Sequence, residues 1–115
     1  MKKNATMQAL PCDVKRLVEK LGYNVKISRL QRNMTQQKLA EAMFATRQTV
    51  ARLEAGDAGI SLGMFFTAVF CLRRLDECKG MLSPENDLEG LMLERRRLLS
   101  RRGGHKEAED SSLDF

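Results

Sequence analysis

Residues 35 to 56 constrain the fold of this chain more than any other stretch, because they predict two short helices joined by a tight turn. Thr35 and Thr46 each stand where a hydroxyl can cap a helix by accepting an orphan N–H of its first turn. Gly56 follows the second helix, where a left-handed residue commonly ends one. Apolar residues recur at helical spacing, at Leu39, Ala40 and Met43 in the first helix and at Val50 and Leu53 in the second.

The other face of the second predicted helix is polar. It carries Arg47, Gln48, Thr49, Ala51 and Arg52. Arginine and glutamine side chains present several hydrogen-bonding groups at once, and these residue types contact base edges in the DNA major groove. The face therefore suggests recognition of double-stranded DNA.

In these residues the stretch resembles the helix-turn-helix of Cro/C1-type transcriptional regulators, also called the Xre type. The matching residues are Thr35, Gln36, Leu39, Ala40, Thr46, Val50, Arg52, Leu53, Glu54 and Gly56. The resemblance extends from about Leu21 to about Leu75. It implies an all-α fold, a five- to six-helix lambda-repressor-like DNA-binding domain.

The resemblance also implies roles for individual residues. The expected base contacts are Thr46, Arg47, Gln48 and Arg52, and the expected phosphate contacts are Thr35, Gln36 and Thr49. Arg29 and Glu54 match positions that commonly form an ion pair between the first and third helices of the family. In the alternative, both are charges that face solvent.

Phe44 departs from the family pattern, which usually has a small turn residue there, most often Gly. A bulky residue in a left-handed conformation costs roughly 1–2 kcal/mol. The sequence therefore predicts either a turn of another shape or a Phe44 side chain whose burial offsets the strain.

The length of 115 residues fits one small domain with extensions. We expect a mobile arm over residues 1–12, the helix-turn-helix domain over 13–80, a C-terminal helix over 81–102 and a disordered tail over 103–115. The expected helix starts are Asp13, Ser61 as a cap, and Ser83-Pro84-Glu85. The helix from Asp13 is expected to reach about Arg32, weakened or bent at Gly22, and the helix after Ser61 to reach about Leu75.

The helix after Ser61 is apolar around nearly its whole circumference, and such a helix must be buried on more than one side. A domain this small covers only one side of it, which predicts a homodimer. The predicted interface residues are Phe65, Phe66, Val69 and Phe70. The alternative is a helix that passes through the middle of a single core.

The positive charge is concentrated in the first half of the chain. Residues 1–55 hold eleven Lys or Arg and four acidic residues, whereas the net charge of the whole chain is +5. A localised basic region is the electrostatic footprint expected for a phosphate backbone. It supports the prediction of a DNA partner.

Several other classes of protein are disfavoured. No apolar run is long enough to span a membrane, and Cys12, Cys71 and Cys78 are odd in number, so we expect a cytoplasmic, nucleoid-associated protein with reduced thiols. The single His105 lies in the predicted tail, away from any catalytic or metal-ligating set. We expect neither an enzyme nor a cofactor.

Three further segments look like those of HipB-like antitoxins, namely residues 21–25, 56–63 and 82–87. This resemblance implies repression of the protein's own operon and binding of a HipA-like kinase toxin. The alternative is a stand-alone or prophage Xre-type repressor with no toxin partner. The tail ends in Leu113-Asp114-Phe115, which either has no role or docks in a partner's pocket.

Overall fold

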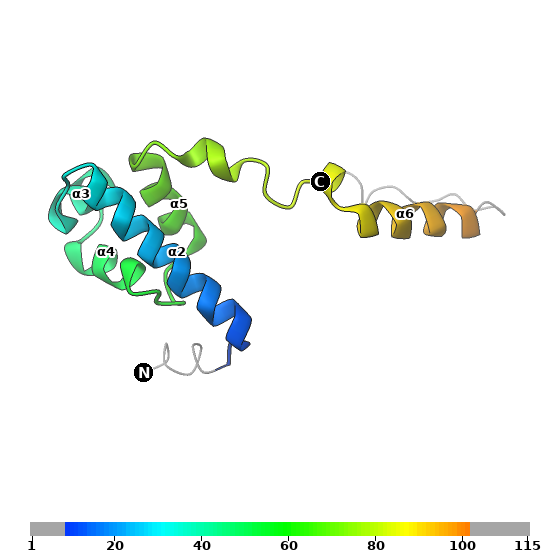
Figure 1. Cartoon of the computed structure of the whole chain (residues 1–115), viewed down its shortest axis with the longest axis horizontal. Coiled ribbons are helices and arrows are strands. Elements are labelled where there is room, and N and C mark those ends of the chain that lie inside the picture. Colours follow the sequence, from blue (N-terminus) through cyan, green and yellow to red (C-terminus); the bar gives the residue numbers. More distant parts are fainter. Residues whose placement is uncertain (1–8, 102–115) are drawn as a thin grey trace. The chain divides into compact units, whose positions relative to one another are not determined.

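The computed structural model describes residues 9–101, which contain five α-helices and no strand (Figure 1). The helices are α2 (Cys12–Gln31), α3 (Gln36–Ala42), α4 (Arg47–Glu54), α5 (Leu62–Cys71) and α6 (Leu88–Ser100), with short 3-10 helices η1 (Leu75–Cys78) and η2 (Pro84–Asn86). The predicted all-α fold is confirmed. Most of the predicted arm and the whole predicted tail, 103–115, lie outside the described residues.

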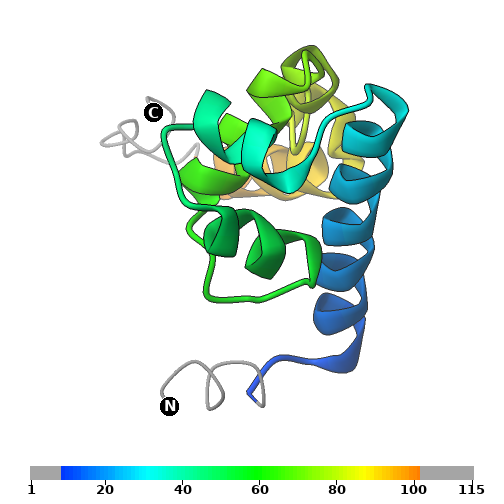
Figure 2. The same cartoon turned by 90° about the vertical axis from the view of Figure 1, so that its left-hand side faces the viewer.

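The chain divides into two compact units between Lys79 and Gly80, called here unit 1 and unit 2. In unit 1 the long helix α2 lies beside the shorter helices, α3 packs against α4 and α5, and α2 packs against α4 (Figure 2). The buried apolar residues of the core cluster come from all four helices or their ends, and they are Val25, Leu39, Ala40, Met43, Val50, Leu53, Ala68 and Leu72.

Three of the unit 1 helices begin with the hydroxyl caps that the sequence predicts. Thr35 Oγ1 accepts a hydrogen bond from the Lys38 amide at 3.0 Å. Thr46 Oγ1 accepts one from the Thr49 amide at 3.1 Å, and Ser61 Oγ caps α5 in the same way. The starts of α3, α4 and α5 are therefore determined locally, by one hydroxyl each.

Helix α2 differs from its prediction at both Asp13 and Gly22. It starts at Cys12 after Pro11, so Asp13 lies in the first turn instead of capping it. The helix continues without a break through Gly22 to Gln31. A Cβ added at Gly22 would lie 2.4 Å from the Leu53 carbonyl oxygen, so the missing side chain lets α2 approach the end of α4.

Helix α5 is shorter than predicted, because it ends at Cys71 and not near Leu75. Arg73 follows with a φ of 64°, a left-handed conformation that turns the chain out of the helix. The backbone then forms η1, so the segment after Arg73 is a separate element and not a continuation of α5.

The C-terminal helix also begins later than predicted. Ser83-Pro84-Glu85 leads into the 3-10 helix η2, and the Ser83 hydroxyl bonds the Glu85 carboxylate instead of capping a helix. Asp87 is the true cap of α6, since its carboxylate accepts a hydrogen bond from the Gly90 amide at 2.9 Å. Asp and Ser serve equally well as caps, so residue type alone did not separate the two positions.

The turn between α3 and α4 fits neither alternative predicted for Phe44. Its φ is 56°, so the backbone keeps the left-handed shape that Gly would favour. The side chain is 97% exposed, so no burial offsets the strain.

Candidate nucleic-acid interface

The first turn of α4 presents polar side chains to solvent. Thr46, Arg47 and Gln48 are all exposed, whereas Val50 and Leu53 of the same helix are buried in the core. The buried residues hold the helix by one face, which leaves its N-terminal end open to a partner.

A buried ion pair fixes the far end of α4. Arg29 Nε and Glu54 Oε2 are 2.6 Å apart, and Arg29 Nη2 donates to Glu54 Oε1 at 3.0 Å. Arg29 Nη1 also donates to the Met34 carbonyl at 2.8 Å, and both charged side chains are almost fully buried. Such two-pronged pairing is strong and directional, so it sets the position of α4 against α2.

A hydrogen-bond chain extends from this ion pair to the surface. Gln36 Nε2 donates to Glu54 Oε1 at 3.1 Å, and Arg47 Nη1 donates to Gln36 Oε1 at 3.0 Å. The side-chain amide of Gln36 therefore holds the exposed guanidinium of Arg47. The buried pair is connected through Gln36 to a residue predicted to contact a base.

The residues predicted to contact phosphate are already engaged in unit 1. Gln36 is held as described, and the Thr35 hydroxyl caps α3. Thr46 Oγ1 and Thr49 Oγ1 lie 3.0 Å apart, within hydrogen-bonding distance. A hydroxyl has both a donor and acceptor sites, so these bonds leave capacity for a phosphate oxygen.

Arg52 is held differently from the other predicted base contacts. Its Nε lies 2.7 Å from Asp57 Oδ2, and Asp57 Oδ1 accepts from the Gly59 amide at 2.7 Å. This ion pair links the last turn of α4 to the loop that follows Gly56. No local pattern in the sequence indicates this role of Asp57, because it depends on how the chain turns after the helix.

A family model described as helix-turn-helix matches residues 25–67, from α2 into α5. Residues 25–67 form a helix-turn-helix domain. No curated protein and no solved structure matches the chain.

In unit 1, the α5 residues predicted to form a dimer interface separate into two groups. Val69 is buried in unit 1, and Phe65 packs against the core. Phe70 is 64% exposed, and Phe66 is half-buried with its ring 5.2 Å from that of Phe65. Val69 is thus the one predicted interface residue that unit 1 buries, and the dimer itself stays a prediction.

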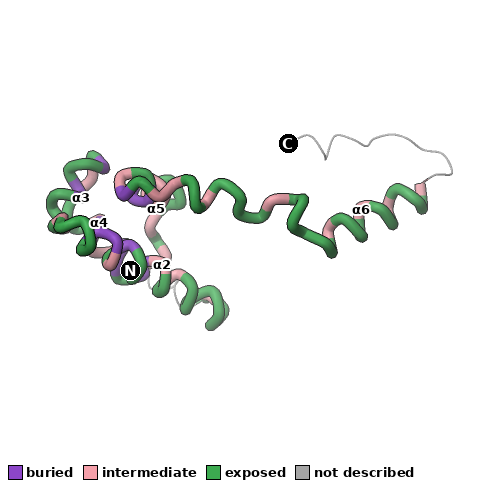
Figure 3. Tube along the Cα trace, turned by 45° about the horizontal axis from the view of Figure 1, so that its top comes forward, coloured by how far each residue is buried: buried purple, intermediate pink, exposed green. Residues whose placement is uncertain are grey.

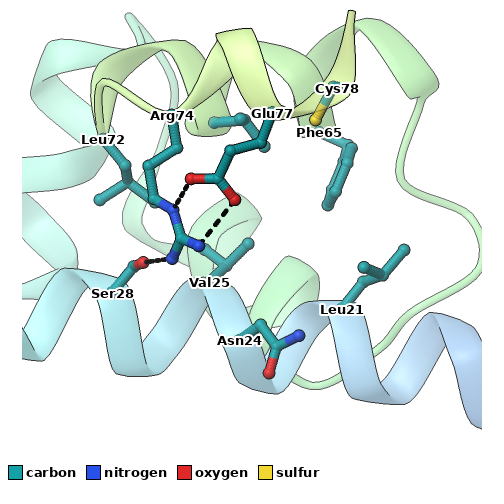
Figure 4. A pocket seen from close by; sticks show the side chains of 10 residues that line it. Leu21, Asn24, Val25, Ser28, Phe65, Leu72, Arg74, Glu77 and Cys78 are labelled. Carbon is teal, nitrogen blue, oxygen red and sulfur yellow. Dashed lines mark hydrogen bonds and ion pairs between the residues drawn. The ribbon is translucent and has the colours of Figure 1, made fainter. Parts of the chain in front are cut away.

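A pocket of about 120 Å³ lies between α2 and the segment after α5 (Figure 4). Arg74 Nη1 donates to Ser28 Oγ at 2.6 Å, and the same guanidinium bonds both carboxylate oxygens of Glu77. The hydrogen bond from Arg74 lowers the pKa of Glu77. Arg74 thus attaches η1 to α2, a contact that the sequence analysis missed because the partners are 46 residues apart.

Within residues 9–101, no helix has the length and apolarity needed to cross a membrane. The same residues contain no group of three His, Cys, Asp or Glu side chains placed to hold a metal ion.

Proposed function

We propose that the protein is a sequence-specific DNA-binding transcriptional repressor that inserts the N-terminal end of α4 into the major groove. The observation that carries the proposal is the chain of bonds from the buried Arg29–Glu54 pair through Gln36 to the exposed Arg47. A side chain held in place before binding loses less freedom when it contacts a base.

Arg47 and Gln48 are the proposed main base contacts. Arginine favours guanine and glutamine favours adenine, and each good pair contributes about 1–3 kcal/mol of discrimination. Thr46 would lie beside them at the start of α4. Arg52 is the more restricted of the two arginines, because Asp57 already holds its Nε atom.

Binding energy would come mainly from the phosphate backbone. The proposed phosphate contacts Thr35, Gln36 and Thr49 lie at or near the N-terminal ends of α3 and α4. Residues 1–55, which include both helices, hold the excess of positive charge. Affinity should therefore fall steeply with salt for every DNA sequence, because counterions are released on binding.

A homodimer on a two-fold operator completes the proposal. One copy of a helix-turn-helix reads only a few base pairs, and two half-sites about one helical turn apart provide the rest. Phe65, Phe66 and Phe70 on α5 are the residues of the interface proposed there that unit 1 does not bury.

The test is selection of bound sequences from random duplex DNA, followed by competition binding at fixed salt. Arg47→Ala and Gln48→Ala should each lose preference at one operator position, by about 1–3 kcal/mol, and keep non-specific affinity. Gln37→Ala is the matched control, since Gln37 is an exposed glutamine on α3 that bonds Glu41. Unchanged sequence preference in both α4 variants would refute the proposal.

The finer proposal is that the repressor is a HipB-like antitoxin that also binds a HipA-like kinase. The residues behind that resemblance also have roles in the fold, since Gly22 permits the contact of α2 with α4 and Ser61 and Asp87 are helix caps. These roles would be needed equally in a stand-alone or prophage repressor. A neighbouring gene for a HipA-like kinase, and copurification of the two products, would decide between them.

A further inference from the structure

Helix α6 carries an uncovered apolar stripe. Its members are Leu88, Leu91, Met92, Leu98 and Leu99, which fall within about 120° of the helix circumference at 3.6 residues per turn. Each of them is between 45% and 72% exposed. Among the described residues of α6 none is buried, as Figure 3 shows by its green and pink tube.

A helix of this kind is poorly stable on its own. Isolated helices shorter than about 12–15 residues are marginal in water, and most helical stability in proteins comes from packing of an apolar face. Helix α6 has 13 residues and lies in a unit of its own. The helix therefore needs a partner surface that packs against its stripe.

The charges beside the stripe indicate which partner fits. Asp87 and Glu89 lie at the N-terminal end of α6, and Arg96 and Arg101 lie toward its C-terminal end. Asp87, Glu94 and Arg101 border one side of the stripe, and Glu89 and Arg96 border the other. Acidic residues at the N-terminal end and basic residues at the C-terminal end also interact favourably with the helix dipole. The charges therefore indicate a partner only because they lie beside the stripe.

We propose that α6 pairs with α6 of a second copy of this chain in antiparallel orientation. Reversing one helix places Asp87 opposite Arg101 of the second copy, and Glu89 opposite Arg96 of the second copy. Two-fold symmetry repeats both pairs, which together outnumber the single like-charged contact of Glu94 with Glu94 of the second copy, so the surface is largely complementary to itself. The inference rests on the proposed function in one respect, namely that such a repressor needs to be a dimer. Its test uses no DNA.

The parallel arrangement is disfavoured by Arg95, which interrupts the stripe near its middle. Parallel helices would bring Arg95 against Arg95 of the second copy and both basic ends together. In the antiparallel pair Arg95 lies opposite Leu91, where its aliphatic stem can pack and its charged end can reach water.

The pair is small. A helix of this length is about 20 Å long, and it offers less than the roughly 800 Å² per partner of a standard interface. We therefore expect self-association in the micromolar range or weaker. On DNA, two chains bound at adjacent half-sites would pair more readily, because their effective concentration is higher.

The first experiment measures self-association of the full chain by sedimentation equilibrium over a wide concentration range. Leu91→Lys should weaken it about tenfold or more, because a second cation would face Arg95 of the second copy. Leu93→Lys is the matched control. Leu93 is 51% exposed on the same helix but lies outside the stripe, so its variant should associate like the wild type.

The second experiment reverses charges. Glu89→Arg and Arg96→Glu should each weaken self-association, and the double variant should restore it. The two residues are seven positions apart, too far to pair within one helix, so restoration must come from contact between copies. A monomeric wild type, an unaffected Leu91→Lys, or a double variant weaker than the singles would overturn the inference. Loss of association in Phe70→Asp with α6 variants unaffected would do the same, and would place the interface on α5.

Discussion

Phe44 combines a strained backbone with a side chain that gains nothing from packing. Its φ of 56° and its exposed fraction of 97% occur together at one position of the turn between α3 and α4. For a residue other than Gly, Asn or Asp, the left-handed conformation lowers the stability of the folded state. Because no burial compensates, the strain should be measurable.

Phe44→Gly should stabilise the protein by about 1 kcal/mol, since glycine adopts a positive φ without steric cost. Urea denaturation followed by far-UV circular dichroism measures the change. Asn33→Gly is the control, because Asn33 also has a φ of 56° but asparagine tolerates it, so its variant should gain less. A less stable Phe44→Gly would show that the ring makes a contact that stabilises the fold.

At Gly22 the fold requires a residue without a side chain, whereas at Phe44 the side chain only adds strain. A Cβ there would come within 3.0 Å of Glu54 O and Gly56 N as well as closer to Leu53 O, and all three are backbone atoms at the end of α4. Gly22→Ala should therefore destabilise the protein by about 1–3 kcal/mol, by forcing α2 and α4 apart.

The control for Gly22→Ala is Gly63→Ala in α5. No described heavy atom lies within 4 Å of a Cβ built at Gly63. Alanine should there stabilise the helix by up to about 1 kcal/mol. Chemical denaturation of both variants gives the comparison, and an equally destabilised Gly63→Ala would mean that backbone propensity and not crowding explains Gly22.

At the scale of elements, two arginines attach neighbouring segments to α2. Arg29 on α2 forms an ion pair with Glu54 at the end of α4, and Arg74 at the start of η1 donates a hydrogen bond to Ser28 on α2. The Arg29–Glu54 pair is buried, whereas the ion pair that Arg74 makes with Glu77 is about half exposed. Removing one partner of the buried pair should therefore harm the fold far more.

The exposed pair gives a test by pH. The hydrogen bond from Arg74 lowers the pKa of Glu77 below its ordinary value of 4.5. A lowered pKa means that the pair stabilises the fold above that ordinary value and that this contribution is lost as pH falls through the lowered pKa. In Arg74→Met, the pKa of Glu77 should rise, as followed by NMR of its carboxyl carbon.

Glu85 is the internal control for that titration. The Ser83 hydroxyl lowers the pKa of Glu85, and both residues belong to unit 2. Its pKa should stay the same in Arg74→Met. An unchanged pKa of Glu77 in the variant would show that the pair does not form in solution.

At the scale of the whole molecule, the boundary after Lys79 separates a unit that has an apolar core from a unit whose described helix, α6, has no buried residue. The apolar core residues of the described chain all lie between Val25 and Leu72, and α6 contributes none. Unit 1 should therefore fold without unit 2, and unit 2 should depend on a partner.

A fragment of residues 1–79 should unfold at the same urea concentration as unit 1 of the full chain. Fluorescence of Tyr23, the only tyrosine, reports on α2 in a chain that lacks tryptophan. Both proteins are compared at equal, low concentration so that association does not add stability. A clearly lower midpoint for the fragment would show that residues 80–115 stabilise the helix-turn-helix domain.

The elements that the sequence predicts best are those whose signals are local. Thr35, Thr46 and Ser61 each cap a helix within three residues, and the apolar spacing of α3 and α4 needs only one turn of context. The family resemblance added the pairing of Arg29 with Glu54, which the structure places in direct contact. The candidate interface on α4 follows from the same local pattern.

The features decided only by the tertiary structure depend on which distant segments meet. Gly22 is read from the sequence as a weak point in a helix, yet the approach of α4 makes it necessary. Likewise the bond from Arg74 to Ser28 joins residues far apart in the chain. Residue type and spacing do not reveal these contacts, because the contacts form only when the helices pack around a common core.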